Sequence, residues 1–243
     1  MAWQVLLSRR ASLSQGAWTV KLVVLDTETT GLSRAVAPHG TPCAISGIGS
    51  EVIQIGGLVL DHKANPVRAF CHYCDCMAPE MSEDARKVNK LSLARIREFV
   101  PNVFPEDVLL TRVPELLADD VVVIGHNISF DLQMLSQSTR NCFPSFSGCP
   151  RVMCRVPSKG RALLDTMSYF SHRRKLSSFY DEVTPLRKVF YARYGETLPF
   201  DTNCPDLFYG DKVDHHNALF DSIETYLVFQ HHIWGKKVSG GRL

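Results

Sequence analysis

Two carboxylates at the end of an apolar run are the first feature of this sequence that could do chemistry. In the stretch KLVVLDTETTGL, the apolar residues 22–25 are followed by Asp26, and Glu28 comes two positions later. If this run is a strand, residues two apart share a face, so both carboxylates point the same way. The DTETTG stretch itself contains no lysine or arginine to neutralise them. Such a pair is typical of a divalent-metal site.

Two further acids stand in comparable settings. Asp131, in GHNISFD, falls in the first turn of an expected helix that follows an apolar strand, and Asp221, in HHNALFD, falls in the last long helix. A lone Asp at such a place is most often an ordinary first-turn or surface residue. Together with Asp26 and Glu28 they make four carboxylates at the edges of buried elements. Four such groups would repel one another and protonate unless divalent metal neutralised them.

The ligand type indicates which metal and which reaction to expect. Oxygen-only ligands select hard ions, so we expect Mg²⁺ or Mn²⁺. Two such ions about 4 Å apart would hold the attacking and leaving oxygens of a phosphodiester displacement. A histidine could take the proton from the attacking water, and His216, five residues before Asp221, is the candidate. Its neighbour His215 is the alternative.

The elements that must position these residues alternate between strand and helix patterns, which favours one α/β domain. Strands are expected at residues 20–26, 51–62, 65–76 and 121–125 and at the start of 161–170. Helices are expected from Ser82 and from Ser92, within 111–120, after a Ser129 cap, at the end of 161–170, after Thr184 and Pro185 as far as Gly195, and over about 217–234. The stretches 34–50, 139–160 and 196–213 fit no element and are expected as loops.

Length and composition set the domain boundaries but say little about partners. With 243 residues, 27.3 kDa and 45% apolar residues, the chain can bury a sizeable core. We expect an N-terminal extension over 1–19, the catalytic domain over 20–235 and a basic tail over 236–243. The net charge of +2 is uninformative, because the carboxylates of a metal site offset a basic rim.

Cysteines and the N-terminus bear on the compartment. No apolar run is long enough for a membrane span, and the first residues lack a secretory signal. Their arginines and serines leave an organellar transit peptide as an alternative to a plain extension. Eight cysteines without such a signal indicate a reducing, intracellular compartment. The group Cys71, His72, Cys74 and Cys76 could bind zinc, but no second ligand pair is evident, so structural thiols are expected.

Three segments carry a resemblance to a known family. DTETTGL, GHNISFD and HHNALFD, in this order, resemble the exonuclease motifs of the DEDDh (DnaQ-like) superfamily, and the similarity spans residues 22–229. The superfamily contains proofreading exonucleases and RNA-trimming enzymes. The resemblance implies a ribonuclease-H-like α/β fold, with a mixed five-stranded sheet, three strands antiparallel, flanked by helices. It also implies that four acids bind metal and that one histidine is the general base, namely Asp26, Glu28, Asp131, Asp221 and His216.

The same resemblance implies residues that bind the substrate. Thr29 would contact the terminal sugar, Leu32 would wedge against the last bases, and Gly31 belongs to a turn whose backbone can approach the terminal nucleotide. His126 and Asn127 would orient the strand end or its phosphate. Each could instead only pack or hold a turn.

Two other features are not counted in the site. Asp165 matches a family Asp–Thr pair that is structural or peripheral. The basic run 172–175 could touch phosphates, but such runs are more typical of solvated faces.

The expected function is a metal-dependent 3′–5′ exonuclease that releases 5′-mononucleotides from single-stranded ends. DNA is mildly favoured over RNA, because DTETTG and HHNALFD resemble the proofreading-type motifs more closely. An RNA-trimming exoribonuclease of the same superfamily is the alternative, and a non-catalytic nucleic-acid-binding scaffold is a third interpretation. A protein partner is conceivable, and the sequence does not identify one.

Overall fold

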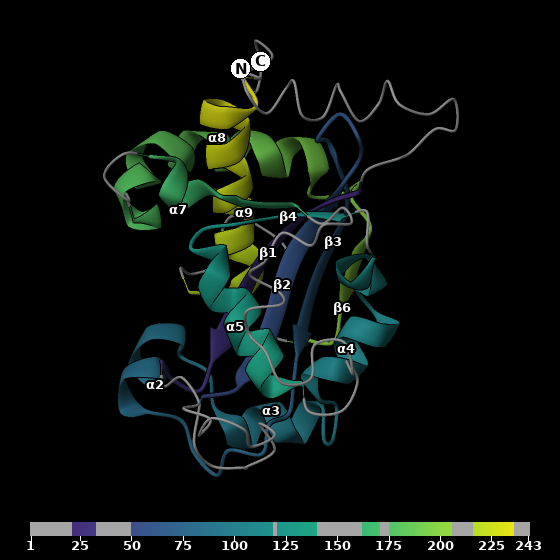
Figure 1. Ribbon diagram of the computed structural model, residues 1–243, viewed down its shortest axis with the longest axis vertical. Coiled ribbons are helices and arrows are strands. Elements are labelled where there is room, and N and C mark those ends of the chain that lie inside the picture. Colours follow the sequence, from purple (N-terminus) through teal and green to yellow (C-terminus); the bar gives the residue numbers. More distant parts are fainter. Residues whose placement is uncertain are drawn as a thin grey trace.

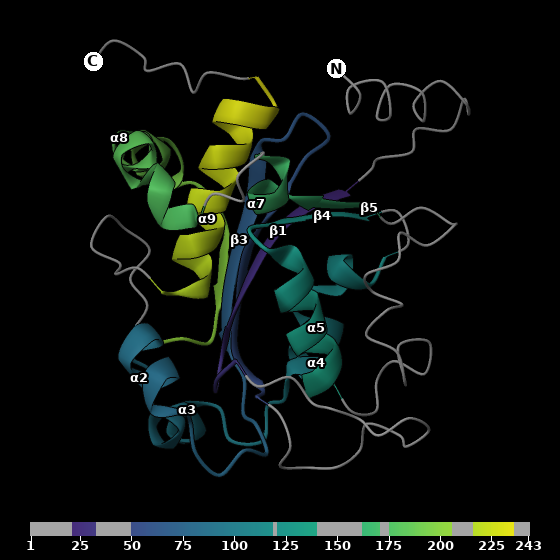
Figure 2. The same cartoon turned by 60° about the vertical axis from the view of Figure 1, so that its left-hand side comes forward.

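The computed structural model describes residues 21–32, 50–118, 121–139, 162–170, 175–205 and 216–235. These residues form a six-stranded sheet in the order β5-β4-β1-β2-β3-β6, with helices on both faces (Figures 1 and 2). No helix in these ranges is long and apolar enough to cross a bilayer.

The sheet is mixed. The antiparallel meander consists of β1 (Lys21–Thr29), β2 (Val52–Leu60) and β3 (Pro66–Tyr73). Strand β4 (Val121–Gly125) runs parallel to β1, and β5 (Ala162–Asp165) runs parallel to β4. This arrangement confirms the predicted ribonuclease-H-like class. A sixth strand, β6 (Phe200–Thr202), pairs parallel with β3 in a stretch expected as a loop. Three residues are too few for a visible alternation, so no pattern in the sequence predicts this strand.

The helices follow the predicted order with shifted boundaries. They are α2 (Glu83–Asn89), α3 (Leu93–Phe99), α4 (Pro105–Thr111), η1 (Pro114–Leu117), α5 (Ile128–Ser138), α7 (Thr166–Tyr169), η2 (Leu176–Phe179), α8 (Tyr180–Tyr194), α9 (Ala218–Val228) and η3 (Phe229–Ile233). The predicted cap Ser82 accepts a hydrogen bond from the Ala85 backbone. A helix expected within 111–120 is only the 3₁₀ turn η1, and α4 lies before it, with Pro105 as its first residue.

Two helix starts differ from the prediction for local reasons. Helix α5 begins at Ile128, and its cap is Asn127 in the left-handed conformation (φ 67°) rather than Ser129. Helix α8 begins at Tyr180, so Pro185 lies inside it. The 3₁₀ turn η2, anchored by buried Phe179, runs directly into α8 and starts the helix before Thr184 is reached.

The two faces of β1 lead into two separate cores. Leu22 and Val24 belong to the core beneath α8 and α9, whereas Val23 and Leu25 belong to the core beneath α4 and α5 (Figure 2). Continuing the alternation, Asp26 and Glu28 extend the row on the α9 side, and residue 27 between them extends the row on the α5 side. The sheet therefore directs the paired acids toward α9.

Helix α9 can reach those acids because one position of β2 has no side chain. Gly56 is the β2 partner of Asp26, and a Cβ there would lie 2.3 Å from the Leu219 nitrogen. Two hydrogen bonds hold the helix at this height: the Ala218 N–H donates to Gln54 Oε1 (3.0 Å), and Ser222 Oγ donates to the Gly56 carbonyl (3.0 Å). A side chain at residue 56 would push α9 away from β1.

Candidate active site

Three of the four predicted acids meet between β1 and the first turn of α9. Carboxylate oxygens of Asp26, Glu28 and Asp221 lie within 4.8 Å of one another. Asn217 caps α9, its Oδ1 accepting from the Leu219 N–H (3.1 Å). This cap and the contact at Gly56 orient the first turn so that Asp221 faces the strand.

The fourth acid is held from the other side of β1. Asp131, in the first turn of α5, is 3% exposed. Its Oδ1 accepts two hydrogen bonds from Thr27, one from the backbone N–H (3.0 Å) and one from Oγ1 (2.8 Å). Asp131 lies outside the 4.8 Å group, but its charge raises the pKa of both Asp26 and Glu28.

The carboxylates destabilise one another's ionised forms. Burial raises the pKa of Asp26 and Glu28 well above their usual range, and the neighbouring acids add to this. Burial raises the pKa of Asp221 to about 7, against a hydrogen bond from the His216 backbone. It also raises the pKa of Asp131 to about 7, against the two bonds from Thr27.

The acid cluster fits a hard divalent cation. Within the described ranges, no lysine or arginine forms an ion pair with these four acids, and Asp221 Oδ1 is shielded from solvent without a hydrogen-bond partner. Mg²⁺ and Mn²⁺ prefer oxygen ligands, and a dication would supply the positive charge that these carboxylates lack.

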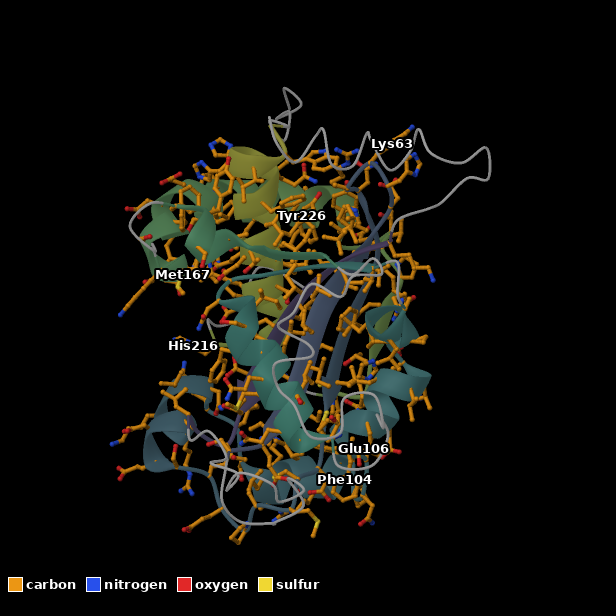
Figure 3. The ribbon with its side chains drawn as sticks, in the orientation of Figure 1. Lys63, Phe104, Glu106, Met167, His216 and Tyr226 are labelled. Carbon is orange, nitrogen blue, oxygen red and sulfur yellow. The ribbon has the colours of Figure 1, made fainter. Side chains whose placement is uncertain are left out.

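The predicted general base lies at the edge of this cluster. His216 directly precedes the cap of α9, is exposed, and has a left-handed backbone (φ 66°). Figure 3 shows it on the flank of the molecule, between Met167 of α7 and helix α2. Its neighbour His215 lies outside the described residues.

In the turn after β1, Thr29 and Gly31 are buried and hold the turn, whereas Leu32 is exposed. Thr29 is buried, and its Oγ1 donates to the Gly31 carbonyl (2.6 Å). A Cβ at Gly31 would lie 2.7 Å from Ser50 Oγ, so the turn is closely packed. Leu32 is 79% exposed. Of these three predicted substrate contacts, Leu32 presents its side chain to solvent.

The turn after β4 is fixed by Asp165. The Asn127 N–H donates to Asp165 Oδ1 (2.8 Å), and His126 Nδ1 lies 2.9 Å from Thr166 Oγ1. Asp165 Oδ1 also accepts from the Met167 N–H (3.0 Å) and so caps α7. These bonds match the predicted structural role of Asp165, and they give His126 and Asn127 a part in holding the turn.

Three features of the site have no clear signal in the sequence. Asn89, buried at the end of α2, hydrogen-bonds to the Glu28 side chain and donates Nδ2 to the Thr29 carbonyl (3.2 Å). Glu224, one turn beyond Asp221 and fully buried, lies 3.2 Å from Arg187 Nη1. Gly56 is the third. Only the general family likeness of the 83–92 stretch pointed toward Asn89.

The cysteine group is packed into the two cores of the protein. Cys71, Cys74 and Cys76 are buried and free, and burial raises the pKa of each thiol. The Sγ atoms of Cys71 and Cys204 lie 3.9 Å apart. Across the described ranges, no cysteine joins a group with the geometry of a metal site.

Comparisons with known proteins identify the family of the chain. A family model described as Exonuclease (RNase_T) matches residues 23–229, which confirms the family predicted from the three motifs. No curated protein sequence matches the chain.

Solved structures show more distant similarity. Escherichia coli Exonuclease I in complex with a dA16 oligonucleotide is 14% identical, with a TM-score of 0.49, over 87% of this chain and 41% of that one. Exonuclease I from Methylocaldum szegediense is also 14% identical, with a TM-score of 0.47, over 88% of this chain and 41% of that one. The chain thus spans less than half the length of these proteins.

Proposed function

The chain belongs to this exonuclease family, as a 3′–5′ enzyme of the DnaQ-like type, and from this premise we propose that it uses a divalent-metal site and His216 to release 5′-mononucleotides from single-stranded DNA. The observation that carries the proposal is the convergence of Asp26, Glu28 and Asp221 within 4.8 Å, with one oxygen of Asp221 lacking a partner.

In this proposal the four acids hold two ions, Mg²⁺ or Mn²⁺. Asp26, Glu28 and Asp221 supply oxygens from the α9 side, and Asp131 supplies its second oxygen while Thr27 fixes the first. When bound, the ions would neutralise charge on the phosphodiester and make the attacking water more acidic. Because the pKa values of Asp26 and Glu28 are raised, protons compete with a metal for these carboxylates, so metal binding should strengthen as the pH rises.

His216 accepts the proton from the attacking water. Its backbone N–H is hydrogen-bonded to the Asp221 carboxylate, which fixes the backbone of this residue beside the acid cluster. The ring is exposed, so it can approach a phosphodiester at the surface of the site.

The turn after β1 contacts the 3′ end of the single-stranded DNA. Leu32 presents an apolar side chain to solvent directly beyond the buried Thr29–Gly31 turn, where it can stack against a terminal base. The preference for DNA rests on the proofreading-type motifs DTETTG and HHNALFD.

The test is degradation of matched DNA and RNA oligomers, each labelled at the 3′ or the 5′ end, with Mg²⁺, with Mn²⁺ and with chelator. We expect immediate release of the 3′ label as a 5′-mononucleotide, a ladder of shortened 5′-labelled products, and no reaction in chelator. A closed single-stranded circle should survive. Faster loss of RNA would assign the alternative, an exoribonuclease, and cleavage of the circle would contradict an exonuclease.

The role of His216 has its own prediction. His216→Ala should lower the rate by roughly 10² to 10⁴-fold, the usual size of a general-base effect, with metal binding retained. His215→Ala is the matched control and should do much less. Single-turnover rates on one oligomer, together with Mn²⁺ binding by the same variants, measure both quantities. Loss of activity in His215→Ala alone would move the base by one residue.

A further inference from the structure

A second group of metal-ligating side chains lies at the other end of α9. Glu182, in the first turn of α8, and His231 and His232, in η3, have ligand atoms within 4.8 Å of one another. Asp221 is in the first turn of α9, whereas these histidines follow its last turn. Figure 2 shows α8 beside the end of α9 that lies farther from α2.

The two histidines lie where the helix changes type. At Phe229 the α-helix gives way to a π-turn, closed by the Trp234 N–H donating to the Phe229 carbonyl (2.8 Å). The rings of His231 and His232 are 4.7 Å apart and nearly perpendicular. Single π-turns of this kind occur frequently at functional sites.

The ring of His232 is already oriented for a ligand. It meets Phe170 edge-on at 5.5 Å and lies tilted at 5.5 Å from Phe179, whose side chain is fully buried. Its Nε2 lies 2.9 Å from Glu182 Oε2, but this nitrogen is shielded from solvent and makes no hydrogen bond of normal geometry. Aromatic packing therefore holds the ring, while its nitrogen faces a carboxylate without being satisfied by it.

The donor set differs in kind from that of the acid cluster. Two imidazoles and one carboxylate are ligands of zinc sites that keep a fourth position open, whereas Mg²⁺ takes oxygen ligands. Ligands of a tetrahedral zinc at about 2.0–2.1 Å would be about 3.4 Å apart. His232 Nε2 and Glu182 Oε2 would need to separate by only about half an ångström to admit an ion, and Glu182 is exposed enough to move.

We propose that Glu182, His231 and His232 form a transition-metal site, selective for Zn²⁺ over Mg²⁺ and separate from the exonuclease centre. The bound ion joins the first turn of α8 to the end of α9. It therefore stabilises the packing of these two helices, because an ion that binds only the folded state adds its binding free energy to folding. The proposal does not depend on the exonuclease activity.

The test is a calorimetric titration of the full chain with Zn²⁺ in excess Mg²⁺, which keeps the acid cluster occupied. Wild-type protein should bind one equivalent of Zn²⁺. His231→Ala and Glu182→Gln should each weaken this binding at least about tenfold, since loss of even a group that only hydrogen-bonds to a metal ligand costs about 10–100-fold. His62→Ala, which removes an exposed histidine from the β2–β3 turn, is the matched control and should bind as wild type does.

A second readout identifies the ligands directly. With ¹⁵N-labelled histidine, Zn²⁺ should shift the ring signals of His231 and His232 and leave that of His62 unchanged. Thermal unfolding of each variant without zinc checks that it folds, and His231, which is exposed, is the safer substitution. Unchanged zinc affinity in both His231→Ala and Glu182→Gln, or ring signals that do not move, would overturn the proposal.

Discussion

Asp131 and Asp221 belong to the same predicted site and both have a pKa raised to about 7, but their carboxylates differ in hydrogen bonding. Asp131 accepts two hydrogen bonds from Thr27 and is fixed without any ligand. Among the described residues, none forms a hydrogen bond with Asp221 Oδ1. The carboxylate on α5 is thus held by hydrogen bonds, whereas the carboxylate on α9 has one oxygen that a cation would satisfy. A bound cation would serve Asp221 more than Asp131.

The sharpest test of this difference compares Asp131→Ala with Asp221→Ala. Both should lose activity by about 10³-fold, since each removes a preorganised charge from the centre. Their stabilities should diverge. Asp131→Ala leaves two Thr27 donors unpaired and should cost about 1–3 kcal/mol, whereas Asp221→Ala releases only the N–H of the exposed His216, which water can satisfy, and should cost less. Urea unfolding in chelator measures this, and equal losses would contradict the comparison.

A second pair of variants separates the two faces of the sheet. Gly56→Ala should displace α9 and lower activity by about 10²-fold, the size expected for an ångström of misplacement. Gly57→Ala is the control, because its Cβ would meet the Val24 carbonyl oxygen and Phe70 on the opposite face. Both should destabilise by about 1–3 kcal/mol. Activity per folded molecule, measured with unfolding curves, should fall much further in Gly56→Ala, and similar losses would disprove the role of Gly56.

The hydroxyl of Thr27 can be tested alone. Thr27→Val keeps the backbone bond to Asp131 but removes the one from Oγ1, so stability should fall by about 1 kcal/mol. Losing that bond raises the pKa of Asp131 further, so the rise of the rate with pH should shift to higher pH. Thr225→Val is the matched control on α9, because its buried hydroxyl has no hydrogen-bond partner. A pH–rate profile unchanged in Thr27→Val would remove Thr27 from the site.

The smallest effect is on thermal stability. Asp131 and Asp221 have folded-state pKa values of about 7 against an ordinary 3.8. Between about pH 4 and 7 the folded state therefore holds protons that the unfolded chain has released, and metal-free protein loses stability as pH rises through this window. Melting curves in chelator should show a lower Tm at pH 8 than at pH 5, and Mg²⁺ should raise Tm by several degrees at pH 8 but little at pH 5.

The control for this effect is the double variant Asp131→Asn and Asp221→Asn, which cannot ionise at these positions. Its Tm in chelator should depend less on pH, and its response to Mg²⁺ should be small. An equally steep loss of Tm in this variant would assign the pH dependence to other groups.

The sequence predicted the parts of the site that lie within single elements. Asp26 and Glu28 share a face of β1 because of strand alternation, and Asp131 and Asp221 lie in first turns of helices that the apolar pattern predicts. The prediction that these acids lie close together came from the resemblance of three motifs, in order, to those of the family. The sequence also predicted the strands of the five-stranded core, because each contains a run of apolar residues, which alternates with polar residues only in the longer strands.

The remaining features depend on contacts between distant residues. Thr27 meets Asp131 across 104 positions, and the Ala218 N–H meets Gln54 across 164. No local pattern encodes such pairs, so the support of Asp131 and the close approach at Gly56 were not predicted. The start of α8 was predicted too late for a related reason: buried Phe179 fixes the preceding turn through tertiary packing.

The docking of α9 at Gly56 also bears on how the protein folds. Strands β2 and β3 are joined by the short turn 61–65, and β1 pairs with β2 across residues 30–51, so all three can pair before the C-terminal part of the chain is made, since loop-closure entropy grows only slowly with loop length. Helix α9 brings Asp221 from more than 150 residues away and must wait until that chain has been synthesised. A nascent chain therefore carries Asp26 and Glu28 side by side without their third partner. If Asp221 binds the metal as proposed, nuclease activity appears only after α9 docks, late in folding.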